Sequence, residues 1–101
     1  MTKKLDRQLI KCIDGALREI FGELGAKAIY SYLRDRYSLR REDIPERLET
    51  FEKGLKDILS SGAWAAERMA LKNLYSNFGL EYRNKTNHRL VDHVSNLKRQ
   101  V

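Results

Sequence analysis

Three side chains in this sequence are of the kinds that bind zinc: Cys12, His88 and His93. A zinc site needs three or four such ligands brought close together. His88 and His93 are five residues apart, which on a helix turns them about 140° away from each other. Asp92 lies four residues after His88, but two ligands are too few. We therefore expect neither a metal site nor a cofactor, and we interpret both histidines as solvated residues on a helix.

Nucleophilic catalysis is also unsupported by the residue pattern. A reactive cysteine needs a nearby base and a lowered pKa, but Cys12 lies beside an apolar stripe and is expected to be a buried structural thiol. The acids Asp43 and Glu46 are spaced as a helix capping box. The sequence contains no glycine-rich phosphate loop. We expect no enzyme activity.

A basic and aromatic run at residues 30–41 is the strongest candidate for a binding site. Arginine binds phosphate in a forked geometry and tyrosine stacks on bases. A second basic set follows residue 82, and the two sets could grip a nucleic acid together. Alternatively, the tyrosines lie at the edge of the core and the arginines solvate the end of a helix. The candidate anion contacts are Arg34, Arg36, Arg40, Arg41, Arg83, Lys85 and Arg89.

The C-terminal residues 83–101 form a basic segment with a narrow apolar seam. The seam consists of Leu90, Val94, Leu97 and Val101, at spacings of four, three and four. Such a stripe is typical of a coiled coil, although two heptads are short. The helix either packs on its own domain or pairs with a second copy. We expect self-association as a homodimer through these four residues.

Charge is distributed unevenly along the 101 residues. The formal net charge is +6, made up of +5 over residues 1–41, −4 over residues 42–67 and +5 over residues 68–101. Basic surfaces attract phosphate backbones or acidic partners. The two basic ends could equally pair with the acidic middle. Cys12 is the single cysteine, and no apolar run suits a signal peptide or a bilayer span, so we expect a cytoplasmic protein with no membrane contact.

Apolar spacings of three and four predict a helix in almost every segment. The expected helices cover about residues 3–21, 24–37, 43–62 and 63–78, and a fifth follows a cap at Asn84 or Thr86. Gly22 and Gly79 are expected to end helices, and Gly15 to mark a close helix crossing. The fold class is therefore all-α: a compact bundle of about five helices in a single domain, residues 1–101, and not a simple up-down four-helix bundle.

Three segments resemble an archaeal family of small helical output domains of the nitrosopumilus type. They are residues 21–29, residues 44–55, and residues 62–80 with Glu67 and Gly79, so the resemblance spans about residues 17–80. It implies a non-enzymatic effector or interaction module and supplies no functional residues. We expect a non-catalytic helical module that contacts itself and a protein partner. The alternative is a small basic nucleic-acid-binding protein.

Overall fold

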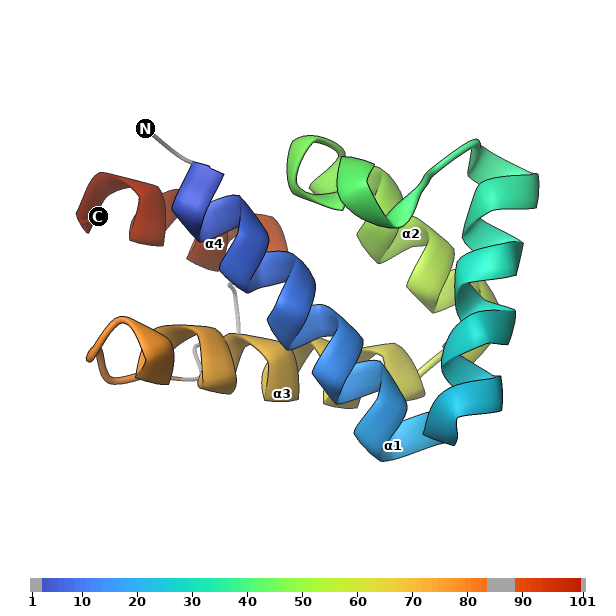
Figure 1. Cartoon of the computed structure of the whole chain (residues 1–101), viewed down its shortest axis with the longest axis horizontal. Coiled ribbons are helices and arrows are strands. Elements are labelled where there is room, and N and C mark those ends of the chain that lie inside the picture. The colour runs from blue at the N-terminus through green and yellow to red at the C-terminus, as the bar shows by residue number, and fades with distance from the viewer. Residues whose placement is uncertain (1–2, 84–88, 101) are drawn as a thin grey trace.

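The computed structural model describes residues 3–83 and 89–100, which contain helices and no strand (Figure 1). The helices are α1 (Lys3–Tyr37), the short 3-10 helix η1 (Arg41–Glu46), α2 (Leu48–Leu59), α3 (Gly62–Asn77) and α4 (Leu90–Gln100). The expected all-α fold of about five helices is thus confirmed. Lys85 and Val101 lie outside the described residues, as do His88 and both expected caps of the last helix.

Helix α1 is two helices joined at a sharp bend. Gly22 has φ 78° and ψ 173°, a conformation that side-chain-bearing residues rarely adopt and that breaks the helix. Figure 1 shows the two halves, residues 3–21 and 23–37, meeting at a steep angle. The prediction that Gly22 ends the first helix is confirmed.

The second half of α1 ends at Ser38, which has φ 52°. The guanidinium of Arg47 reaches back and donates hydrogen bonds to the carbonyl oxygens of Tyr37 (3.0 Å) and Ser38 (2.9 Å). Unpaired carbonyls at a helix end are thereby satisfied by a positive charge. The predicted capping box is wrong: Asp43 and Glu46 lie inside η1, and α2 begins only at Leu48, without a side-chain cap.

The first half of α1 lies against α3, and the second half lies against α2. Asn77 of α3 donates to Gln8 (3.0 Å), whereas Gly54 of α2 faces Leu33 and Tyr37. A Cβ at Gly54 would overlap Leu33 Cδ2, so this glycine marks the close crossing. The crossing predicted at Gly15 is wrong, because an added Cβ there would meet nothing within 4 Å.

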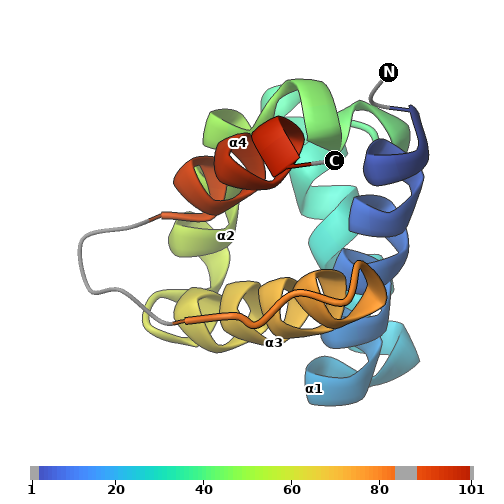
Figure 2. The same ribbon diagram turned by 90° about the vertical axis from the view of Figure 1, so that its left-hand side faces the viewer.

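The last helix closes the bundle. Figure 2 shows α4 in front of α2 and above α3, and it contacts both helices. Its first backbone N–H groups are held by acids: Leu90 N donates to Glu52 Oε2 of α2 (3.1 Å), and Arg89 N donates to Asp92 Oδ2 (2.9 Å). The helix therefore begins at a site set by α2.

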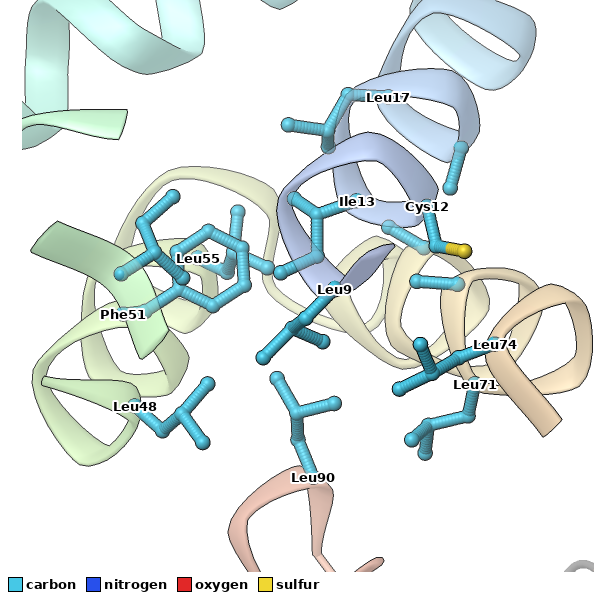
Figure 3. Packing of buried hydrophobic residues seen from close by; sticks show 14 of the residues in the cluster. Leu9, Cys12, Ile13, Leu17, Leu48, Phe51, Leu55, Leu71, Leu74 and Leu90 are labelled. Carbon is cyan, nitrogen blue, oxygen red and sulfur yellow. The ribbon is translucent and has the colours of Figure 1, made fainter. Parts of the chain in front are cut away.

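One apolar core lies at the centre of these helices. In Figure 3, Leu9 and Ile13 of α1 lie between the side chains of α2 and those of α3, and Leu90 of α4 points at them from below. Phe51 and Leu55 complete the α2 side. Each helix thus contributes to a single core.

Candidate interaction surfaces

The apolar seam of α4 is occupied by the protein's own core. Leu90, Val94 and Leu97 are 1%, 1% and 0% exposed and pack among residues of α1, α2 and α3. A second copy could reach them only if α4 left the domain. Of the two alternatives open from the sequence, packing on the domain is the observed one, so these three residues form no self-association surface in this structure.

His93 lies on the same inner face of α4, and the expectation that it is solvated is wrong. It is 6% exposed, and its ring lies 5.2 Å from that of Tyr82. The hydroxyl of Tyr75 is 3.4 Å from both the His93 Nδ1 and its carbonyl oxygen. The signal was in the spacing, since position 93 is three residues after Leu90 and four before Leu97.

Cys12 is buried, as expected, and burial raises the pKa of its thiol. A raised pKa disfavours the thiolate, the form that attacks substrates or binds metals. Within residues 3–83 and 89–100, no group of three or more His, Cys, Asp or Glu side chains is arranged to hold a metal ion.

Two open grooves border α3: one of about 440 Å³ is lined by Arg68 and Tyr82, and one of about 530 Å³, between α2 and α3, is lined in part by Trp64. The second groove contains Glu52 and Glu67, two partly buried carboxylates. Burial, followed by the charge of Glu52, raises the pKa of Glu67 to about 7. Burial also raises the pKa of Glu52, whose Oε2 is already bound to the α4 backbone. Glu52 therefore holds the start of α4, and we assign it that structural role.

The structure does not bring the two predicted basic sets together. Arg34, Arg36, Arg40 and Arg41 are exposed around the junction of α1 and η1. This junction is at the upper right of Figure 1, whereas the chain after α3 and the start of α4 are on the left. The described members of the two sets therefore lie in separate regions of the molecule, and Lys85 is outside the described residues.

Several of these arginines are paired with neighbouring acids. Arg34 Nε lies 3.2 Å from Asp35 Oδ1, and Arg83 Nη2 lies 3.4 Å from Glu81 Oε1. Arg89 is also exposed, beside the groove between α2 and α3. Exposed pairs of this kind contribute little free energy. These ion pairs do, however, reduce the positive charge that is available to bind an anion.

Asp14 connects the two halves of α1 with η1. Its carboxylate accepts hydrogen bonds from Arg18 Nε (2.9 Å) and the Tyr30 hydroxyl (2.9 Å), and Arg41 Nη1 lies 3.7 Å away. Burial, together with the hydrogen bond to Asp14, raises the pKa of Tyr30 well above its usual range. Tyr30 and Arg41 therefore help to hold α1 and η1 together, whereas the sequence had placed both in a predicted nucleic-acid-binding run.

Two surface features are not among the residues predicted from the sequence. The first is a row of basic side chains on the outward face of the first half of α1: Lys4, Arg7, Lys11 and Arg18, all exposed. Their spacing of three, four and seven mirrors the apolar stripe on the opposite face and could have revealed them.

The second feature is an apolar surface at the bend of α1. Leu24 is 82% exposed and Ile20 is 36% exposed, and the half-buried ring of Phe21 lies between them in sequence. The Phe21 ring also reaches the turn between α2 and α3, where a Cβ on Gly62 would lie 4.0 Å from it. We call Ile20, Phe21 and Leu24 the bend surface.

Basic and acidic residues flank the bend surface in equal numbers along the sequence. Arg18, Glu19, Glu23 and Lys27 sum to zero formal charge. Glu23 lies 3.1 Å from Arg18 and 3.8 Å from Lys27. This region is thus locally neutral in a chain whose net charge is +6.

No protein-family model, no curated protein and no solved structure matches this chain. The resemblance of residues 17–80 to output domains therefore stays a prediction. Among the described residues, no helix is both long enough and apolar enough to cross a membrane.

Proposed function

We propose that this protein is a non-catalytic helical interaction module whose copies pair through the bend surface. The observation that carries the proposal is Leu24, a large apolar side chain left 82% exposed two residues after the bend at Gly22. It projects outward because it lies two residues before Ala26, on the face opposite the buried stripe of the second half of α1. The core therefore gives no packing reason for a leucine there.

A second copy is the partner that the local charge favours. Two molecules of net charge +6 repel each other over most of their surfaces. The neutral border of the bend surface is a place where they approach without that repulsion. In a two-fold pair, Arg18 and Lys27 of one copy can face Glu19 and Glu23 of the other, as a self-complementary interface requires.

The expected affinity is modest. Fully burying a leucine stabilises by about 1.5–3 kcal/mol, so the two Leu24 side chains contribute about 3–6 kcal/mol between them. Association also costs translational and side-chain entropy. Because this cost offsets part of the gain, we expect a weak dimer with a dissociation constant on the order of 1 mM. Such pairing suits a regulatory or signalling output role, and the lone thiol Cys12 supports the cytoplasm as its place.

Sedimentation equilibrium tests the proposal. We expect a monomer–dimer equilibrium for the wild type that Leu24→Ser weakens at least tenfold. Trp64→Ser is the matched control, since Trp64 is 55% exposed on α3, outside the bend surface, and should leave the equilibrium unchanged. A wild type that stays fully monomeric up to 1 mM, on the order of the expected constant, overturns the proposal. Loss of dimer in Trp64→Ser but not in Leu24→Ser overturns it as well.

A further inference from the structure

The outward face of the first half of α1 is a continuous basic row. Lys4, Arg7, Lys11 and Arg18 are exposed, and Leu9 and Ile13 point the opposite way into the core. With a rise of 1.5 Å per residue, the row is about 21 Å long. We call these four residues the basic face of α1.

Most of the positive charge on this face is available. Among the described residues, Lys4, Arg7 and Lys11 have no ion pair or side-chain hydrogen bond with an acid. Asp14 at the edge of the face is contacted by both Arg18 and Arg41, so its charge is compensated. The face therefore presents a row of like charges to solvent.

Gly15 leaves the middle of the basic face bare. It is exposed inside a helix, where glycine destabilises by about 1 kcal/mol relative to alanine. Packing gives no reason for it, because an added Cβ would meet nothing within 4 Å. A glycine here does let an extended ligand approach the helix backbone closely between Lys11 and Arg18.

A row of this shape fits a linear polyanion. Each strand of a DNA duplex carries one phosphate per 3.4 Å of axis, so about 21 Å spans about six phosphates. The face carries no large exposed apolar side chain to insert into a bilayer, which disfavours a lipid surface. We propose that the basic face of α1 binds the phosphate backbone of duplex nucleic acid without reading its sequence.

The test is a salt titration of binding to a fluorescent 20-bp DNA duplex, followed by anisotropy. Three to four phosphate contacts predict that log K falls with log[salt] with a slope of about −3. The triple variant Lys4→Gln/Arg7→Gln/Lys11→Gln should flatten the slope by about 2–3 and weaken binding at least about tenfold at low salt. Circular dichroism checks that each variant is folded.

The matched control removes the same charge elsewhere. Lys53→Gln/Lys72→Gln/Lys98→Gln neutralises three exposed lysines on α2, α3 and α4, and should keep most of the binding and the slope. Equal losses in the two triple variants would show that net charge alone attracts DNA and would overturn the site. The proposal is also overturned if the wild type does not bind the duplex at about 20 mM salt, where phosphate contacts are strongest. Binding to phosphatidylserine vesicles without binding to the duplex overturns it as well.

Gly15→Gln provides a second, opposed readout. Replacing an exposed helical glycine should raise the melting temperature by about 4–8 °C. The added side chain should nevertheless weaken duplex binding severalfold by preventing close approach. A more stable variant with unchanged affinity would contradict contact at the centre of the face. Because none of these changes touches Leu24, failure here is distinguishable from failure of the dimer proposal.

Discussion

The seam of α4 and the bend of α1 carry side chains of the same chemical kind in opposite surroundings. Leu90, Val94 and Leu97 are at most 1% exposed, whereas Leu24 is 82% exposed. Both sets have helical spacing, since Ile20 and Leu24 are four residues apart, as are Leu90 and Val94. Spacing alone therefore does not decide which apolar surface is covered.

The difference teaches where an unsatisfied apolar surface arises. A stripe that runs along a helix can be covered by neighbouring helices, as α2 and α3 cover α4. Leu24, two residues after the bend at Gly22, has no such cover and stays 82% exposed.

The largest expected effect is on the unfolding free energy, from a substitution in the buried seam of α4. Leu97→Ala should destabilise the domain by about 2–5 kcal/mol, since it leaves a cavity in a fully buried site. Leu24→Ala should change the unfolding free energy of the monomer by less than about 0.5 kcal/mol. Urea unfolding at low protein concentration measures both. Similar midpoints for the two variants would contradict the assignment of α4 to the core.

A pair of glycines sharpens the contrast between covered and open positions. Gly54→Ala should destabilise by about 1–3 kcal/mol, because its Cβ would overlap Leu33. Gly15→Ala should instead stabilise by about 1 kcal/mol, because its site is open. Thermal unfolding followed by circular dichroism distinguishes the signs. A stabilising Gly54→Ala would mean that α2 does not contact α1 at this point.

A smaller effect concerns how the stability of the domain depends on pH through Glu67. Glu67 has a pKa of about 7 in the folded protein against 4.5 as its ordinary value, so the folded state holds its proton more tightly. Its contribution to stability is complete below pH 4.5 and is lost as the pH rises through about 7. Glu52 and Lys56 are the charged neighbours. The loss should be about 1–2 kcal/mol, given that the side chain is only partly buried.

Glu67→Gln isolates this effect. The variant cannot ionise, so it should match the wild type at pH 4.5 and be more stable at pH 8, on the order of 1–2 kcal/mol. Urea midpoints at the two pH values give the comparison. A wild type whose advantage grows with pH would have the wrong sign for a carboxyl group disfavoured by burial.

Much of the fold follows from residue spacing and glycine position. The apolar stripes placed the helices, Gly22 ended the first half of α1, and Gly79 ended α3 with φ 70°. The capping box failed because Asp43 and Glu46 satisfy a local rule while Pro45 is buried in a tighter turn. The contact of Gly54 with Leu33 depends on the relative placement of two helices, which the spacing within either helix does not contain.

The candidate surfaces were less predictable than the fold. Spacing identifies an apolar seam in α4, but its burial depends on α2 and α3. The basic face of α1 could have been predicted from the sequence, because its residues lie opposite the apolar stripe at helical spacing. The outward direction of Leu24 also follows from its spacing to Ala26, but the absence of a covering helix depends on where α2 and α3 lie.

Disulfide cross-linking tests most directly whether the bend, and not α4, is where two copies meet. Ala28 is exposed one turn after Leu24, and Ser95 is exposed on the outer side of α4. Because the native thiol of Cys12 is buried, the wild type serves as the blank. Under mild oxidation we expect Ala28→Cys to form covalent dimers, and to lose them when Leu24→Ser is added. Faster cross-linking of Ser95→Cys than of Ala28→Cys would contradict pairing through the bend.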